Sequence, residues 1–429
     1  MTSRFLYSFF FLLALHLIPC FAQTPTSLTL ADAEKIAIQN HPQIQAAQYT
    51  ANAAKAQVTQ ARSAYYPQVF GSLTGVKSET DSRVAAGFLS NSIIYDRYSN
   101  GITVGQLVTD FGRTHEFVQS ASLHAQAQEE NVVTSRADVL LAVDQAYYAV
   151  LKAQAVLKVA QETVKDRQLV SDQITELEKN KLKSGLDVSF ANVDLAQAQL
   201  LLIQAQNNVQ ASYADLSVAL GYSDQKTYVL SDESVPAAPP ADVTQLSSQA
   251  LRNRPELIGG RLGVSSAQSY ATAERDLWFP TISAMGVAGL TPVREEPLGS
   301  RYAAAGFNVN IPIFNGRQFN ALHAEATAEA HAQEQYLRDL QNRVTRDVRR
   351  AWLDANSAFQ RLSVTQQLLN QATLALDLAQ QRYKLGLSSI IELSQAQLNM
   401  TQAEITQTSA KYDYAAAISA LRFQIGDIH

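Results

Sequence analysis

Histidine and carboxylate side chains that could bind a metal ion lie close together at one place in the sequence, where His323 and Glu325 are followed by His331. A zinc site needs three or four ligands at short, regular spacings. The two histidines are eight residues apart in a segment rich in Ala and Glu, which is typical of an exposed helix, and no second group of ligands supports them. We therefore predict surface histidines, no metal site and no cofactor.

A glycine-rich stretch, GSLTGVKS at residues 71–78, superficially resembles a phosphate-binding loop. It lacks the adjacent Gly-Lys pair that such a loop needs, and it lies in a segment that we expect to form a strand. No Ser/His/Asp group or paired carboxylates suggest catalysis. The net charge is a mild -5 and the basic residues are scattered, so nothing indicates a nucleic-acid surface. We predict that the protein is not an enzyme and binds no nucleic acid.

The first 22 residues have the pattern of a secretory signal peptide. Arg4 precedes an almost uninterrupted apolar run over residues 5–19, and cleavage is expected after Ala22. The run is short for a membrane span, and we expect no transmembrane helix after it. Cys20 is the only cysteine and follows a proline, so lipid attachment is the less favoured alternative. A mature chain from residue 23 contains no cysteine and forms no disulfide.

Glycine and proline are absent from four long segments, which predicts four long helices. The segments lie between Gly112 and Gly185, Gly185 and Gly221, Gly316 and Gly386, and Gly386 and Gly426. They are rich in good helix formers, and their apolar residues recur at steps of three and four, as in a coiled coil. A helix of about 70 residues rises ~105 Å. We expect two long and two shorter coiled-coil helices, each long-short pair divided by one glycine.

Two regions, 67–112 and 280–316, differ from the helical segments because they contain several glycines and short alternating runs. The clearest alternation is in residues 304–314, AAGFNVNIPIF, where four apolar side chains share one face, Phe307, Val309, Ile311 and Ile313. About ten alternating residues is the length of a membrane-spanning strand. A soluble hairpin would show the same alternation, so the pattern alone leaves both alternatives open.

The two halves of the chain repeat one order of motifs. Asn40-His41-Pro42 recurs as Asn253-Arg254-Pro255, and Tyr66-Pro67 recurs as Phe279-Pro280, both at an offset of 213. Three further matches are Phe111-Gly112-Arg113 with Asn315-Gly316-Arg317, Val143 with Val348, and 182–186 with 383–387. We predict a duplication with a first repeat over 23–235 and a second over 236–429. Each reads helix, strand, strand, long helix, turn and shorter helix, and a Pro-rich connector, 231–242, lies at their junction.

Four duplicated features carry a family resemblance: the Asn-His/Arg-Pro openings, the aromatic-Pro strand entries, the Phe-Gly-Arg and Asn-Gly-Arg exits, and the paired Lys-x-Gly-Leu turns. With these features the chain resembles the TolC family of outer-membrane efflux and secretion channels, the outer membrane factors. The resemblance covers essentially the whole mature chain. It implies a mainly α homotrimer with membrane β structure, in which long coiled-coil helices form an α-barrel across the periplasm. Four strands per protomer would contribute to a 12-stranded outer-membrane β-barrel. Four strands alone cannot close a barrel, and open edges are not tolerated in lipid.

The resemblance also implies that a periplasmic tip opens and closes the channel and meets an adaptor. The turns that form this tip would be Gly185-Leu186 and Gly386-Leu387. Members of the family carry an aromatic residue three before the second glycine, here Tyr383, and an acidic residue six after it, here Glu392. In a trimer Glu392 would place three carboxylates around one axis, and such a ring favours cations.

Asn192 occupies the position that we match to the family's acidic partner of the gate tyrosine. The resemblance therefore implies a neutral Tyr383–Asn192 hydrogen bond, worth about 0.5–1.5 kcal/mol. Tyr383 also lies on the apolar seam and could be a packing aromatic, and Glu392 could be a solvated helix carboxylate.

The leading functional hypothesis is a trimeric outer-membrane exit duct of a tripartite efflux or type I secretion system. It would conduct substrates passively across the periplasm and outer membrane of a Gram-negative type envelope. The implied partners are outer-membrane lipid, a periplasmic membrane-fusion adaptor and an inner-membrane pump of the RND, ABC or MFS type, which would supply the energy. The alternative is a non-channel periplasmic coiled-coil adaptor or scaffold, whose glycine-rich segments form soluble hairpins.

Overall fold

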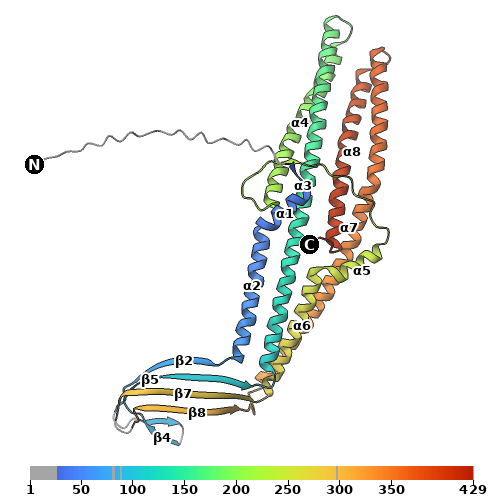
Figure 1. Cartoon of the computed structure of the whole chain (residues 1–429). Coiled ribbons are helices and arrows are strands. Elements are labelled where there is room, and N and C mark those ends of the chain that lie inside the picture. Colours follow the sequence, from blue (N-terminus) through green and yellow to red (C-terminus); the bar gives the residue numbers. More distant parts are fainter. Residues whose placement is uncertain (1–26, 80–82, 87–88, 296–297, 429) are drawn as a thin grey trace, which may run out of the picture.

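The computed structural model describes residues 27–79, 83–86, 89–295 and 298–428. The predicted signal peptide, 1–22, and Cys20 within it lie outside the described residues. Long helices run side by side along the molecule and a sheet lies at one end (Figure 1).

Each half of the chain follows the predicted order, helix, strand, strand, long helix, turn and shorter helix. The elements of the first half are α1 (Leu30–Asn40), α2 (Pro42–Arg62), β2 (Gln68–Val76), β5 (Arg97–Thr109), α3 (Arg113–Lys179) and α4 (Gly185–Ala219). Those of the second half are α5 (Val243–Asn253), α6 (Pro255–Arg275), β7 (Thr281–Arg294), β8 (Arg301–Asn310), α7 (Gln318–Lys384) and α8 (Ile390–Gln424). The internal duplication is therefore confirmed.

The repeats match in helix length as well as in order. The long helices α3 and α7 both have 67 residues, and the shorter helices α4 and α8 both have 35. The opening helices align at the predicted offset of 213 residues, from Leu30 to Val243. The long hairpins align at 205 residues, because α3 begins at Arg113 and α7 at Gln318. The eight-residue difference lies between these elements, where the sheet and its loops are.

Two layers of four helices share α3 and α7. On the side of the sheet the neighbours run α2, α3, α6, α7, and on the far side they run α4, α3, α8, α7 (Figure 1). The edges of the layer beside the sheet are therefore α2 and α7, and the edges of the layer on the far side are α4 and α7.

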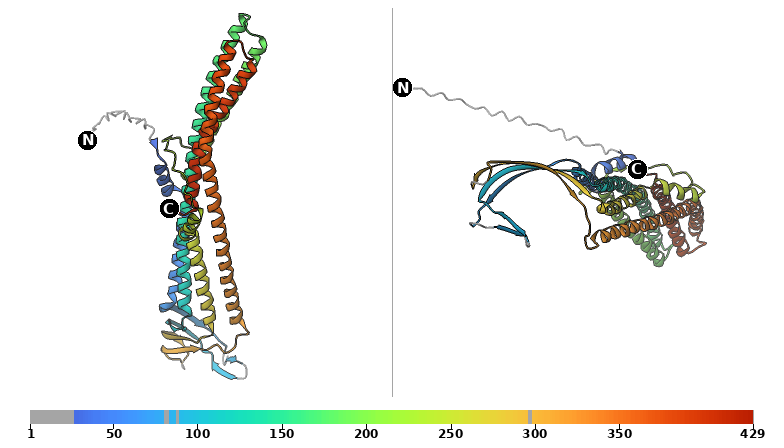
Figure 2. Two further views of the ribbon diagram at one scale, coloured as in Figure 1. Left: turned by 90° about the vertical axis from the view of Figure 1, so that its right-hand side faces the viewer. Right: turned by 90° about the horizontal axis from the view of Figure 1, so that it is seen from below.

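The main sheet has four antiparallel strands in the order β2-β5-β7-β8. It is strongly curved and extends to one side of the helices (Figure 2). Its edges are β2 and β8, each of which pairs on one side only among the described residues. The sheet also joins the repeats directly, because β5 of the first repeat pairs with β7 of the second. A short antiparallel pair, β3 (Arg83–Ala86) and β4 (Leu89–Ile93), lies between β2 and β5 in the sequence.

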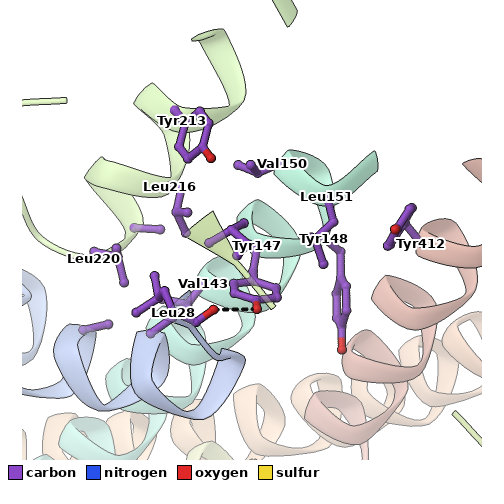
Figure 3. Close-up of a cluster of buried hydrophobic side chains, with 14 of the residues drawn as sticks. Leu28, Val143, Tyr147, Tyr148, Val150, Leu151, Tyr213, Leu216, Leu220 and Tyr412 are labelled. Carbon is purple, nitrogen blue, oxygen red and sulfur yellow. Dashed lines mark hydrogen bonds between the residues drawn. The ribbon is translucent and has the colours of Figure 1, made fainter. Parts of the chain in front are cut away.

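The largest buried core lies midway along the helices, and we call it the equatorial cluster (Figure 3). At its centre Tyr147 is fully buried, and its hydroxyl donates to the carbonyl oxygens of Leu28 at 2.9 Å and Ser231 at 2.7 Å. Leu28 is the second residue of the short strand β1 (Ser27–Leu28), and Ser231 follows its parallel partner β6 (Val229–Leu230). The connector between the repeats is thereby fixed to the helices.

Candidate functional site: the helical tip

The two helical hairpins end in turns with the same backbone geometry. Each long helix closes with a Schellman motif, in which the amide of Leu182 donates to the Leu177 carbonyl at 2.9 Å and that of Leu387 to the Arg382 carbonyl at 2.8 Å. The residue in the left-handed conformation is Lys181 in the first turn, with φ 59°, and Gly386 in the second, with φ 74°. Gly386 therefore ends its helix as predicted, since glycine adopts this conformation without a steric penalty.

The predicted equivalence of Gly185 and Gly386 is wrong. Gly185 is the first residue of α4, after the N-cap Ser184, and its structural counterpart is Ile390, the first residue of α8. The counterpart of Gly386 is Lys181. The sequence match failed because the first turn carries lysine where glycine was expected, so the Lys-x-Gly-Leu pattern aligned residues four positions out of step. Leu186 then corresponds to Ile391, and Leu387 to Leu182.

The corrected alignment also changes the pairing of the acidic residues. Glu392 corresponds to Asp187, because both are the third residue of their helices. Asp187 forms a capping box, in which its Oδ2 accepts from the Ser184 amide at 2.9 Å. Glu392 instead accepts a hydrogen bond on Oε1 from Arg382 Nε at 2.9 Å. The exposed Glu392 carboxylate therefore has a counter-charge within its own turn.

Tyr383 lies in the hydrophobic core at the tip, which we call the tip cluster. This cluster draws on all four helices of the hairpins, with Ile174 from α3, Ala191 from α4, Ala379 and Tyr383 from α7, and Ile390 from α8 among its members. Tyr383 is 7% exposed. Burial and the nearby negative charge of Asp187 raise the pKa of Tyr383 to about 12, so its hydroxyl stays protonated.

The predicted Tyr383–Asn192 hydrogen bond is not formed. Asn192 Oδ1 accepts from Ser171 Oγ at 2.8 Å and so joins α4 to α3 of the same hairpin. The Tyr383 hydroxyl is buried and has no hydrogen-bond partner among the residues that the structure describes. Tyr383 therefore contributes through its ring.

Lys183 and Arg382 complete the site, and sequence reasoning missed both. Lys183 Nζ lies 3.7 Å from the centre of the Tyr383 ring, a cation–π contact that joins the first turn to the second helix pair. Both lysines nearest to Tyr383, Lys183 and Lys384, line a cavity of about 330 Å³ beside the tip cluster. A signal for Arg382 was available in the sequence. A basic residue in the last turn of one helix and an acidic residue in the first turn of the next both interact favourably with the helix dipoles.

The outermost turns of the tip expose apolar side chains among charged ones such as Lys181 and Lys384. Five large aliphatic side chains are between 58% and 73% exposed there, and they are Leu182, Leu186, Leu385, Leu387 and Ile391. Four of them form two equivalent pairs in the corrected alignment, so both turns present the same apolar surface.

The residues first considered for metal or phosphate chemistry have structural roles. His323 Nδ1 lies 3.1 Å from the Ala271 carbonyl, and His331 lies on α7 beside Glu334. Across the described ranges, no group of three or more His, Cys, Asp or Glu side chains could hold a metal ion. Residues 71–76 belong to β2, and Lys77 pairs with Asp96 at 2.5 Å.

Comparison with known proteins identifies the family. The family model described as outer membrane efflux protein matches residues 35–222 and 246–427, nearly the whole of both repeats. The chain belongs to the outer membrane efflux protein family. It is thus an outer-membrane channel protein rather than an enzyme, and the resemblance found in the sequence is confirmed.

Relatives of this outer membrane efflux protein function in efflux and in secretion. It is 24% identical to the outer membrane efflux protein BepC of Brucella suis biovar 1, over 93% of this chain and 85% of BepC. It is also 24% identical to the alkaline protease secretion protein AprF of Pseudomonas aeruginosa, over 93% of this chain and 85% of AprF. A crystal structure of CusC superposes with a TM-score of 0.80 at 19% identity, covering 94% of this chain and 93% of CusC. This similarity confirms the fold.

Proposed function

We propose that the chain is one protomer of a trimeric exit duct that conducts substrates passively across the periplasm and the outer membrane. The observation that carries the proposal is the pair of open edges that the protomer leaves in both its sheet and its helical layer. Among the described residues, the two sheet edges leave backbone groups without strand partners, and the two helical edges expose apolar side chains.

The sheet supplies the first pair of edges. Large apolar side chains are exposed on its edge strands, among them Phe70 and Leu73 on β2 and Phe307 and Val309 on β8. In lipid an unpaired strand edge leaves backbone polar groups without partners, so spanning strands must form a closed barrel. Pairing β8 of one copy with β2 of the next extends the curved sheet, and three copies supply the 12 strands that the resemblance implies.

The helices supply a matching pair of edges. On α4 the exposed residues Leu186, Val193 and Leu200 recur at seven-residue intervals, the spacing of a coiled-coil seam. By length and composition α4 could cross a membrane, because it contains an 18-residue segment with a mean hydropathy of 1.2. Only 11% of that segment is buried within the protomer. In the structure α4 packs antiparallel against α3 in the hairpin, and we propose that a neighbouring protomer covers its free face.

The complementary surface is on α7. Exposed apolar residues along it include Val364, Leu368, Leu374 and Leu378. Packing α7 of one protomer against α4 of the next is a head-to-tail contact, and such contacts close into a ring when the rotation between copies allows it. The direction of assembly agrees with that of the sheet, because α7 and β8 lie at one edge and α4 and β2 at the other.

The apolar tip is the surface that we assign to partner proteins. A periplasmic adaptor would dock on the turns that contain Gly185-Leu186 and Gly386-Leu387, and an inner-membrane pump of the RND, ABC or MFS type would supply the energy. The names of the relatives, an efflux protein and a protease secretion protein, support a role in either efflux or secretion. The same tip would be the gate, in which Tyr383 and Lys183 hold the two hairpins together and Asn192 braces the first hairpin. Glu392, partly neutralised by Arg382, would set the charge around the opening.

Conductance in a planar lipid bilayer tests the proposal. Detergent-solubilised protein should insert and give discrete steps of ionic current. Recovery of the protein as a water-soluble monomer that leaves the bilayer silent would refute it.

A further inference from the structure

The seam between the two hairpins changes character midway between the equatorial cluster and the tip cluster. This seam is the contact of α3 with α8, since α3 pairs with α4 and α7 pairs with α8 within each hairpin. The buried residues of α3 between Leu151 and Ile174 are Ala160, Thr163, Arg167 and Ser171. Those of α8 between Ala396 and Tyr412 are Gln397, Ala403 and Ala410. The side chains buried in α3 and α8 at this level are therefore small or polar, and larger apolar ones, Leu201, Leu398 and Ile405, line the hollow beside them.

Arg167 is the one charged residue among these buried positions. Its side chain reaches from α3 to α8, where Nη2 donates to the Gln397 carbonyl oxygen at 2.9 Å and to Thr401 Oγ1 at 3.2 Å. The residue is 8% exposed. Burial lowers the pKa of the Arg167 guanidinium and the negative charge of Asp194 opposes that shift, and a guanidinium stays charged in proteins.

A second polar contact supports the seam from α4. Asp194 Oδ1 accepts from Ser394 Oγ of α8 at 2.8 Å. Arg167, Asp194 and Ser394 line one hollow, in which α3, α4 and α8 meet. Among the described residues, the first hairpin therefore holds the second by three hydrogen bonds at this level, two from Arg167 and one to Asp194, and the bond to the Gln397 carbonyl is the buried one.

Opening the seam at this level breaks these contacts. A hydrogen bond to a charged group contributes about 1.5–3 kcal/mol, and Nη2 of Arg167 makes two such bonds from α3 to α8. Alanine side chains at the same level offer only weak dispersion contacts. The contact of Arg167 therefore resists separation of the hairpins more strongly than the alanine contacts do.

We propose that Arg167 is the clamp that sets how far the two hairpins separate at the tip. Its effect on pore width rests on the proposed channel function, whereas its effect on hairpin separation does not.

The separation can be measured with spin labels on the two turns. Cysteines at Leu182 and Leu387, both exposed, would be labelled in a Cys20→Ser background, and labelled chains would be diluted with unlabelled ones so that only distances within one protomer are seen. Arg167→Met should shift the distribution toward longer distances and raise the ratio of parted to joined hairpins about tenfold, a change of ~1.4 kcal/mol.

Lys165→Met is the matched control. It removes one positive charge from the same helix two residues away, and Lys165 is exposed, so the distance distribution should not change. Thr401→Val removes one acceptor with little change in shape and should give a smaller shift in the same direction. It also keeps the proposal testable if Arg167→Met fails to fold. Distributions for Arg167→Met and Thr401→Val that match those of the control would overturn the proposal.

Bilayer recordings of the same variants separate the two proposals. If the parent protein conducts, Arg167→Met should raise its resting conductance and Lys165→Met should not. If the parent protein never conducts, the channel proposal fails, while the label distances still decide whether Arg167 is the clamp. A conducting parent whose resting current is unchanged by Arg167→Met, together with unchanged distances, would refute the clamp alone.

Discussion

Replacing Tyr383 with phenylalanine should stabilise the tip. The substitution removes one hydroxyl and keeps the ring that packs in the tip cluster and lies beneath Lys183. That hydroxyl is buried without a hydrogen-bond partner in the part of the chain that the structure describes. No described protein group therefore replaces the hydrogen bond that this hydroxyl makes to water in the unfolded chain.

The magnitude follows from the cost of an unsatisfied polar group. Burying a hydroxyl without a partner costs about 1–3 kcal/mol, so Tyr383→Phe should stabilise the tip by about that amount. The sign would be opposite if the hydroxyl were a latch, because losing a satisfied hydrogen bond costs about 0.5–1.5 kcal/mol.

Tyr147 provides the matched control, because it is buried and its hydroxyl makes two hydrogen bonds, to the Leu28 and Ser231 carbonyls. Tyr147→Phe leaves both acceptors with one donor fewer and should destabilise the equatorial cluster by about 1–2 kcal/mol. The same chemical change should therefore have opposite effects at the two sites.

Hydrogen exchange resolves the two regions in one experiment, since local opening free energies are read from individual segments. In Tyr383→Phe the amides of Gly386 and Leu387, which close the second turn, should exchange more slowly than in the parent protein. In Tyr147→Phe the segments around β1 and β6 should exchange faster. Faster exchange at the tip of Tyr383→Phe would show that the hydroxyl has a partner and would refute this explanation of the gate tyrosine.

Three further predictions concern the charges and the surface of the protein. Arg382→Gln should increase the cation preference of the channel, because it removes the positive charge that pairs with the Glu392 carboxylate, and Glu392→Gln should decrease it. Equal reversal potentials in the two variants would exclude a charge ring at this level. Asp144 is 3% exposed, and its burial, together with the negative charge of Glu34, raises its pKa to about 7. The stability of the protein should therefore fall as pH rises from about 4 through 7. Asp144→Asn should raise the melting temperature at pH 8 and change it little at pH 4, and an equal effect at both pH values would contradict the buried charge. Leu387→Ser should reduce cross-linking of the tip to its adaptor severalfold without changing resting conductance, and unchanged cross-linking would place the docking surface elsewhere.

The architecture could be predicted from sequence because its signals are local and repeated. Helices without glycine or proline over dozens of residues leave few alternatives, and the paired prolines at a fixed offset reveal the duplication before any contact is known. The alternation from Phe307 to Ile313 predicted a strand, and β8 contains Phe307 and Val309 but ends at Asn310, so Ile311 and Ile313 lie beyond it. None of these inferences depends on knowing which side chains meet across the fold.

The details of the tip could not be predicted, because they depend on which residue occupies each turn position in space. A left-handed lysine, Lys181, replaces the expected glycine at a cost of about 1–2 kcal/mol, and sequence patterns do not reveal such exceptions. The expected bond of Tyr383 to Asn192 failed for another reason, because Asn192 bonds to Ser171 within its own hairpin. The ring contact of Lys183 with Tyr383 likewise joins residues 200 positions apart in the chain.

The mass of the detergent-solubilised assembly tests the central claim most directly. Native mass spectrometry should give a closed complex of three chains, because each copy offers one pair of edges, β2 with α4 and β8 with α7, and three copies supply twelve strands. A stable monomer or dimer, or a series of masses without an end point, would contradict the claim that these edges close into a channel.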